Sequence, residues 1–304
     1  MATLKGENFR ICIWDTTEEK YRVIGMSTGC NITLTNNTEE ASHKDIVGSA
    51  SMPTTVSKSW SVSVDSLDVS DTATMLTAIK AMEPVLLMWD ETSTTDNQTR
   101  QKATFARKGL AFFNDLTVTF NNRTNATKQI QLTGAGPIET VGSSEAVDVI
   151  TVGSVTKGQY VRLFLSSDNT TAPTLVVAAA RDLSMHVSVS LESSTTKDTA
   201  GDFEVQEPTS LAYDISSSAL VRSGETISSL VGAKTFGNLE SIYEAGTPVK
   251  WKIANVSGDN NRTASSTLVS GSAVLTSLTV NAPNRTPVDY SATLNGYGDF
   301  TVGS

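Results

Sequence analysis

Hydrophobic and polar residues alternate along several stretches of this chain, a pattern typical of β-strands that have one buried and one solvated face. Residues 59–65 place Trp60, Val62 and Val64 on one phase and serines on the other. The same alternation occurs in residues 116–120, 185–191 and 274–280. Most of the ordered structure is therefore expected to be β.

Two other patterns predict buried strands and helices. Nearly continuous apolar runs at 85–89 and 249–253 each follow a Pro, which is typical of entry into a strand. Ser70-Asp71 precedes apolar residues at helical spacing, and this helix is expected to end before Glu83-Pro84 because the residue before Pro disfavours the α conformation. Residues 223–243 have a similar spacing, interrupted by Gly232 and Gly237. Each half of the chain is thus expected to contain one helix.

The order of these elements repeats, and short sequence matches repeat with it. Residues 6–14 resemble 158–166, and residues 132–136 resemble 294–298. Between these ends the matches keep one order: Lys44-Asp45 with Lys197-Asp198, Trp60 with Tyr213, Pro84 with Pro248, and Leu116 with Leu278. Self-similarity in a fixed order indicates duplication. We expect a first β domain at 1–137, a linker at 138–157 and a second β domain at 158–304, with extra residues between Tyr213 and Pro248.

Length and charge agree with this division and narrow the function. A chain of 304 residues exceeds what one core usually supports, and half of it is a common domain size. The net charge of −9 disfavours a surface that grips nucleic acid, because such binding depends on Lys and Arg neutralising phosphates. The sequence has no signal peptide pattern and no apolar run of membrane-spanning length, so a soluble protein made in a cytoplasm is expected.

Candidate catalytic chemistry is sparse. Cys12 and Cys30 are expected to be buried or half-buried thiols without a disulfide. His43 and His186 are expected on the solvated surface, with no acid or nucleophile pattern around them. The sequence contains no metal-ligand spacing, phosphate-binding loop or nucleophile elbow, and Gly134-Ala-Gly136 is interpreted as a tight strand exit. No catalytic residue, cofactor or metal is predicted, and an enzyme is the least favoured class.

The order of elements, the Ser/Thr-rich strands, the long polar loops, the single helix and the repeated Leu-x-Gly-x-Gly strand exit resemble the major tail tube proteins of long-tailed bacteriophages. The resemblance covers each half separately. It implies two tandem β-sandwich or barrel domains of the tail-tube type, each with one flanking α-helix. It also implies a virion protein of the phage tail that assembles in the host bacterial cytoplasm.

The resemblance further implies partners. Tail tube domains form six-domain rings around a channel for DNA, so three chains of this protein would form one pseudo-hexameric ring, and rings would stack into a tube. The main partner would be the protein itself, with tape measure, tail terminator and distal tail proteins as further partners and no membrane. DNA would pass through without specific binding, since an acidic or hydroxyl-lined bore does not retain phosphates.

Candidate residues follow from the wet phases of the strands and from the two polar loops. The candidate lumen-facing positions are Ser61, Ser63, Asp65, Asp214, Ser216, Thr117, Thr119 and Thr279. Residues 36–58 and 192–210 would correspond to the family's loop that contacts the adjacent ring, and are expected to be mobile in a free subunit. The candidate inter-ring residues are Glu39, Glu40, Lys44, Asp45, Lys197, Asp198 and Asp202.

Two alternatives remain open. Two immunoglobulin-like modules in series could form a capsid decoration protein or a receptor-binding protein, which would expose an aromatic patch for its ligand. Aromatic residues make up only 6% of the chain, and Trp60, Trp89 and Trp251 lie in strand patterns that suit a core. The second alternative, a subunit of the tube of a contractile tail or injection machine, is closer to the tail tube interpretation, but such subunits usually have one domain.

Overall fold

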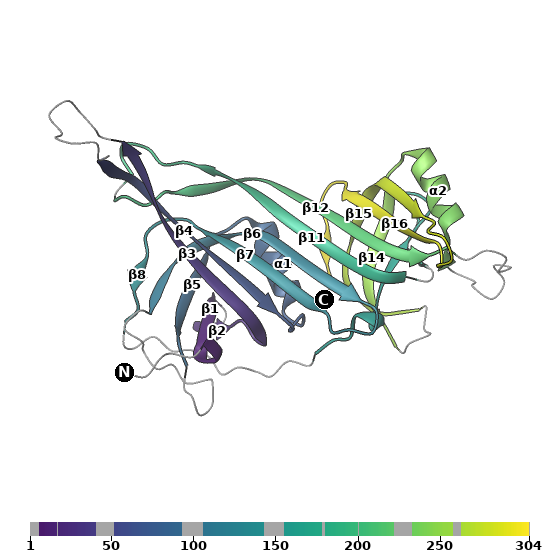
Figure 1. The fold of residues 1–304 in the computed structure, drawn as a ribbon, viewed down its shortest axis with the longest axis horizontal. Helices are drawn as coiled ribbons and strands as arrows, with labels where there is room; N and C mark the ends of the chain where they lie inside the picture. The colour runs from purple at the N-terminus through teal and green to yellow at the C-terminus, as the bar shows by residue number, and fades with distance from the viewer. Residues whose placement is uncertain are drawn as a thin grey trace.

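The computed structural model describes residues 6–16, 18–40, 52–92, 106–142, 155–177, 180–199, 201–221, 233–257 and 263–303. These residues form a mainly β structure in which 17 strands are connected through hydrogen-bonded pairs, together with the α-helices α1 and α2. The first half of the chain lies at one end of the molecule and the second half at the other (Figure 1). The expected predominance of β structure is confirmed.

The first half contains these elements: a 3-10 turn η1 (Gly6–Asn8), β1 (Phe9–Asp15), β2 (Lys20–Val23), β3 (Ser27–Glu40), β4 (Pro53–Ser66), α1 (Thr72–Ala81), β5 (Val85–Glu91), β6 (Arg107–Asn121), β7 (Thr127–Gly134) and β8 (Glu139–Thr140). The second half contains η2 (Gly158–Tyr160), β9 (Val161–Leu165), β10 (Leu175–Val177), β11 (Ala180–Ser193), β12 (Gln206–Leu220), β13 (Ala233–Lys234), α2 (Phe236–Ala245), β14 (Val249–Val256), β15 (Ala264–Asn281), β16 (Asp289–Gly296) and β17 (Thr301–Val302).

Strand pairing follows the same plan in both halves. The pairs β1–β2, β1–β5, β3–β4, β4–β7, β5–β6, β6–β7 and β6–β8 recur as β9–β10, β9–β14, β11–β12, β12–β16, β14–β15, β15–β16 and β15–β17. The bulge between Phe113 and Asp115 in β6 recurs between Leu275 and Ser277 in β15. The matched residues that lie in described strands, such as Trp60 with Tyr213 and Leu116 with Leu278, therefore occupy equivalent ladder positions, while the exact domain boundaries stay a prediction. Lys44-Asp45 lies outside the described residues.

The bulge in β6 lies where this strand changes partners. Residues 107–111 pair with β5, and residues 115–121 pair with β11 of the second half. Bulges bend a strand and increase its twist, which lets one strand serve two sheets. The result is a continuous ladder in the order β3-β4-β7-β6-β11-β12-β16-β15. We call these eight strands the main sheet.

One face of the main sheet is buried, as the alternation predicts. Val62, Val64, Met185 and Val187 are buried, and they belong to one hydrophobic cluster that continues from the first half into the second. Trp60 in β4 lies against Gly134, and its counterpart Tyr213 in β12 lies against Gly296. The repeated glycines thus leave room for an aromatic ring on the adjacent strand, besides ending the strand.

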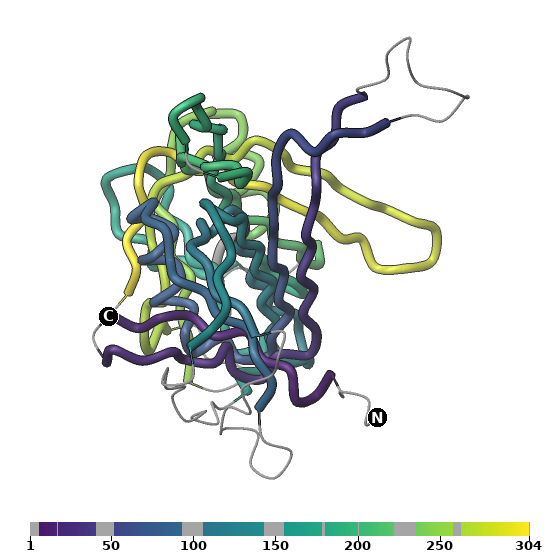
Figure 2. Tube along the Cα trace, turned by 90° about the vertical axis from the view of Figure 1, so that its left-hand side faces the viewer, coloured from purple at the N-terminus to yellow at the C-terminus, as the bar shows by residue number. Residues whose placement is uncertain are grey.

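The polar segments 36–58 and 192–210 were expected to be loops, and this is wrong for much of their length. Residues 36–40 and 53–58 extend the β3–β4 hairpin, and residues 206–210 extend β12. The β3–β4 hairpin projects from the rest of the first half (Figures 1 and 2), and the β11–β12 hairpin extends from the second half over the first (Figure 1). A two-stranded ribbon that is polar on both faces gives no hydrophobic alternation, so its Thr and Ser content was the only strand signal.

Other expectations are confirmed or corrected. Helix α1 ends before Pro84 as expected, whereas α2 begins at Phe236, and residues 222–232 lie outside the described residues. The expected linker 138–157 includes β8, which pairs with β6. Neither cysteine forms a disulfide, and Cys12 is buried as expected. Cys30 is exposed instead, because the outer edge of β3 has no neighbouring strand within the described residues.

The contact between Gly134 and Trp60 makes a testable prediction for stability. A Cβ on Gly134 would lie 2.3 Å from the Trp60 indole, so Gly134→Ala is expected to destabilise the protein by about 1–3 kcal/mol through overpacking. Gly237 in α2 has open space around its Cβ position, so Gly237→Ala should change stability by less than about 1 kcal/mol, in the stabilising direction. Chemical denaturation of both variants measures the two effects, and an unaffected Gly134→Ala protein would contradict the packing.

Candidate self-assembly interface

The two halves are joined edge to edge through β6 and β11. Their antiparallel ladder runs from Asp115 opposite Ser188 to Asn121 opposite Asp182. On the buried face, Leu116 lies opposite Val187 and Val118 opposite Met185, and all four side chains are at most 3% exposed. This ladder, which we call the internal junction, combines backbone hydrogen bonds with a dry apolar seam.

A polar bridge spans the other face of the internal junction. His186 in β11 bonds through Nε2 to Asp115 in β6 at 2.6 Å and through Nδ1 to Asp214 in β12 at 2.8 Å. Burial lowers the pKa of His186, but the hydrogen bonds and charges of Asp214 and Asp115 raise it more, so the net shift is upward. His186 was expected to be a solvated surface residue; it is partly buried and links three strands instead.

Further contacts hold the halves together away from the ladder. The β3–β4 hairpin meets the end of the β11–β12 hairpin, where Lys58 bonds to Asp202 at 2.9 Å and Glu204 accepts hydrogen bonds from Asn37 and Ser57. At the end of α1, Lys80 donates to the Phe300 carbonyl oxygen at 2.7 Å and pairs with Asp299 at 2.8 Å. The amide of Gly158 also donates to the Thr124 carbonyl oxygen at 2.9 Å, so the halves are fixed in one relative position at several places.

The two strands of the internal junction, β11 and β6, correspond to β3 and β15, and neither counterpart has a strand from the other half beside it within the described residues. Within the described residues, β3 pairs only with β4, and residues 277–281 of β15 pair only with β16. Leu34 corresponds to Val187 and is 66% exposed, and Val280 corresponds to Val118 and is 46% exposed. These two edges lie at opposite ends of the main sheet, so one chain cannot join them to each other in this structure (Figure 1).

The candidate lumen-facing residues lie on one face of the main sheet. Directly paired residues share a face, and the register places Asp65, Gln129, Thr117, His186, Asp214 and Asn295 in one row across six strands. Ser61, Ser63, Thr119, Ser216 and Thr279 occupy the same face by the same register. That this face lines a channel stays a prediction.

This face has more carboxylates than cationic groups. We define the polar face by the positions of the main sheet that share a side with Thr117, from Gly29 to Thr35 in β3 across to residues 277–281 in β15. Among these described positions the carboxylates are Asp65, Asp115, Asp182, Asp214 and Asp289. The guanidinium of Arg181, at the bulge of β11, lies 3.8 Å from the Asp289 carboxylate. The remaining positions are mostly hydroxyl and amide side chains.

The candidate inter-ring residues are divided between strands, loops and undescribed positions. Glu39 and Glu40 lie in β3, Lys197 and Asp198 lie between β11 and β12, and Lys44 and Asp45 lie outside the described residues. Asp202 pairs with Lys58 of the same chain. Their contact with an adjacent ring stays a prediction.

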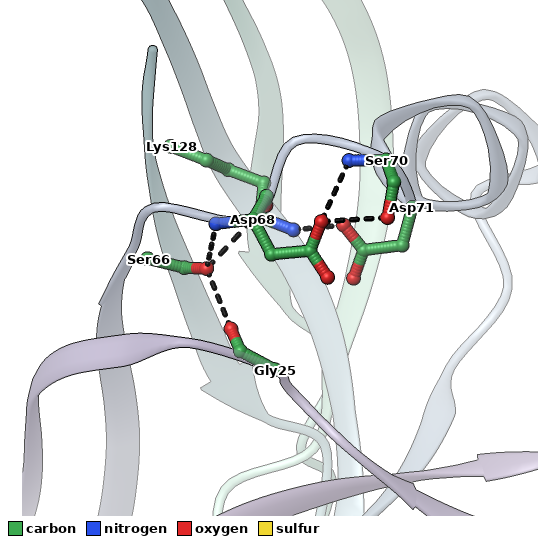
Figure 3. Close-up of polar contacts among 6 residues, drawn as sticks. All are labelled: Gly25, Ser66, Asp68, Ser70, Asp71 and Lys128. Atoms are coloured by element: carbon green, nitrogen blue, oxygen red, sulfur yellow. Dashed lines mark hydrogen bonds and ion pairs between the residues drawn. The ribbon is translucent and has the colours of Figure 1, made fainter. Parts of the chain in front are cut away.

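A buried polar cluster beside α1 is structural. Lys128 in β7 is fully buried and bonds to Asp71, and Asp68 accepts hydrogen bonds from Ser70, while Ser66 donates to the Gly25 carbonyl oxygen (Figure 3). Burial raises the pKa of Asp71, and Lys128 opposes that shift. In the second half, the position of Lys128 is taken by Tyr290, whose ring packs against Phe236 of α2. One cluster is ionic and the other aromatic, and both attach a helix to the main sheet.

The described residues offer little support for a catalytic or metal site. A groove of about 710 Å³ lies beside Lys80, Tyr213 and Asp299, where the two halves meet, and no nucleophile with an adjacent base lines it. Within the described ranges, no group of His, Cys, Asp and Glu side chains is arranged to hold a metal ion. No helix in the described part of the chain is long and apolar enough to cross a membrane.

The most informative residues of the interface were not identified from sequence. In β3, Cys30, Ile32 and Leu34 alternate with Asn31, Thr33 and Thr35, which is a strand signal, but it lies within a Thr/Asn-rich segment. The bridge of His186 joins residues that are 71 and 28 positions apart in the chain, so no local pattern could have revealed it.

Comparisons with known proteins give a coarse likeness only. No family model matches the chain, and no curated protein matches it. A chain from the tail of an empty gene transfer agent particle with C6 symmetry is similar at a TM-score of 0.38 and 11% identity, covering 49% of this chain and 99% of that one. A chain from the virion of a native gene transfer agent gives 0.35 and 11%, with coverage of 49% and 99%. The SPP1 tail tube gives 0.32 and 16%, with coverage of 48% and 78%.

The bridge of His186 makes the stability of the internal junction depend on pH. A raised pKa in the folded state means that protonated His186 stabilises the fold below its ordinary pKa of 6.5, and that this stabilisation is lost as pH rises through the folded pKa. His186→Thr, which copies Thr33 of β3, should therefore destabilise the protein by about 1 kcal/mol at pH 5.5 and by less at pH 8.5. Unfolding measured at both pH values tests this, and an equal loss at both would contradict the charged bridge.

Proposed function

We propose that this protein is a structural subunit of a phage-type tail tube, made of two tandem tail-tube-type β domains. Chains join head to tail, three chains close a pseudo-hexameric ring, and rings stack into a hollow tube through which DNA is ejected. The observation that carries the proposal is the internal junction together with its two unpaired counterparts. A chain that already joins two copies of one unit edge to edge, and exposes the same edges at its ends, is suited to continue that pairing.

Physical chemistry favours closure of such an assembly. A contact between two different surfaces of identical chains generates either a ring or an open helical filament. Unpaired strand edges are sites of aggregation, and closing a sheet into a ring removes them. Each half of the chain would pair with the next half through equivalent strands, so every contact around the ring would have a similar geometry. Such a repeated contact favours closure.

The polar face supports passage of DNA without retention. Protein binding to DNA depends on cations that displace counterions from phosphates, and the carboxylates outnumber the cations on the described part of this face. Its cationic groups are also held by carboxylates, since Arg181 pairs with Asp289 and His186 lies between Asp115 and Asp214. A channel lined by Asp, Ser, Thr and Asn side chains would repel DNA weakly along its length. We therefore assign this face to the lumen, and place tape measure, tail terminator and distal tail proteins as further partners at the tube and its ends.

The first test is whether the protein polymerises. Purified, concentrated protein examined by negative-stain electron microscopy is expected to show hollow tubes of uniform width with axial striations. Particles that stay monodisperse at every concentration would contradict the tube and favour a capsid decoration or receptor-binding protein.

The second test asks which face lines the channel. Assembled Asp65→Lys tubes are expected to retain short duplex DNA at low salt in a nuclease-resistant form, and to release it as salt is added, whereas unmodified tubes retain none. Glu240→Lys, at an exposed position of α2, is the matched control, and any DNA bound there should be digested. Equal nuclease resistance for both variants would remove Asp65 from the lumen.

A further inference from the structure

The two ends of the main sheet are complementary at the level of single residues. Strands β3 and β11 pair with β4 and β12 in the same register, since Leu34 lies opposite Trp60 as Val187 lies opposite Tyr213. Both strands also have bulges at equivalent places, after Ser27 and after Ala180. The exposed edge of β3 therefore has the same backbone arrangement as the edge of β11 that pairs with β6.

Strand β15 corresponds to β6 in the same way. Ser277 follows the bulge in β15 as Asp115 follows the bulge in β6, and each lies opposite its neighbour at the equivalent position, Thr293 in β16 and Gln131 in β7. Residues 277–281 of β15 therefore correspond to residues 115–119 of β6, the segment that pairs with β11.

We infer that β15 of one chain pairs with β3 of a second copy in a single register, with Thr279 opposite Thr33. This inference rests on the proposed ring and specifies its contact between chains. The other pairs follow from the internal junction: Ser277 with Thr35, Leu278 with Leu34, Val280 with Ile32, and Asn281 with Asn31. We call this contact the external junction.

The exposed apolar side chains fit this register. In the internal junction, Leu116 meets Val187 and Val118 meets Met185 on the buried face. The external junction places Leu278 against Leu34 and Val280 against Ile32 on the corresponding face. Leu34 and Val280 are solvent-exposed in one chain, and pairing would bury them as their counterparts are buried.

A second contact would accompany the ladder. In the internal junction, Lys80 of α1 reaches Asp299 and Phe300, immediately before β17. Tyr243 of α2 follows the buried Ile242 as Lys80 follows Ile79, and it is 50% exposed. The residues that correspond to Asp299 and Phe300 are Pro137 and Ile138, immediately before β8. Tyr243 therefore meets Pro137 and Ile138 of the second copy, an apolar contact in place of an ion pair.

The two junctions consequently differ in chemistry. The internal junction has the Asp115–His186–Asp214 bridge and the Lys80–Asp299 pair, whereas the external junction has Ser277, Thr33 and Ser61 at the bridge positions and Tyr243 at the helix. If β15 of a second copy replaced β6 beside β11, His186 would face Ser277 and lose its bond to Asp115. This loss favours pairing of β15 with β3 over displacement of β6 from β11.

Disulfide formation between two singly substituted proteins tests the register. In a Cys30→Ser background, Thr33→Cys protein is mixed with Thr279→Cys protein under mild oxidation, and Ile32→Cys with Val280→Cys is run in parallel. Opposite residues of an antiparallel ladder alternate between wide and close spacing, so one of these two mixtures meets the geometry that a disulfide requires. That mixture should give covalent dimers, while each protein alone gives none.

Register controls use residues two positions away on the same face. Thr35→Cys or Asn31→Cys mixed with Thr279→Cys should give roughly tenfold less dimer, because a disulfide needs Cβ atoms about 3.5–4.5 Å apart. Dimer that is favoured by a shifted pair, or by Thr33→Cys protein with itself, would overturn the inference.

Polymer formation tests the same contact without a cross-link. Leu34→Lys and Tyr243→Ala should each reduce polymer measured by sedimentation, while Leu110→Lys, at a 47% exposed leucine outside the external junction, should leave it unchanged. Equal polymer from Leu34→Lys and Leu110→Lys would also overturn the inference.

The outcomes separate this inference from the proposed function. Tubes in the microscope with cross-links in another register would leave the tube standing and remove the external junction described here. Register-specific cross-links without tubes would support the junction and contradict the tube. Neither cross-links nor polymer would overturn both.

Discussion

The requirement that backbone N–H and C=O groups of a strand be paired governs this structure. The internal junction satisfies that requirement between the two halves of the chain, since β6 extends beyond β5 and continues as the partner of β11. The apolar seam under the ladder then buries Leu116, Val118, Met185 and Val187. The same requirement is unmet at β3 and at the end of β15 within the described residues, and the proposals for self-assembly depend on it.

The bulge in β6 makes this arrangement possible. By inserting a residue before Asp115, it bends the strand out of the sheet formed with β5 and directs it toward the second half. Because β15 has the same bulge before Ser277, its end is directed away from β14 in the same manner. A local irregularity in the ladder therefore determines both how the halves join and where a second copy would bind.

The two halves keep one backbone plan while their polar clusters differ. Lys128 and Asp71 attach α1 to the main sheet in the first half, and Tyr290 and Phe236 take that role in the second. His186 bridges two carboxylates at the internal junction, while its counterpart Thr33 has a strand on one side only, β4, within the described residues. Pairing patterns depend on the backbone, whose plan the two halves share, whereas the side chains differ because each half has its own neighbours.

The sequence by itself determined the strands with a buried phase, the helix α1 and the internal repeat, because alternation, Pro boundaries and matched glycines are local signals. It did not determine the far end of the β3–β4 hairpin, residues 36–40 and 53–58, where neither face is apolar, or the exposure of Cys30. Only the tertiary structure decided that β6 pairs with β11 and that His186 lies between Asp115 and Asp214. It also decided that, within the described residues, β3 and residues 277–281 of β15 each have a neighbouring strand on one side only. These depend on contacts between residues far apart in the chain, and no local periodicity encodes which edge meets which.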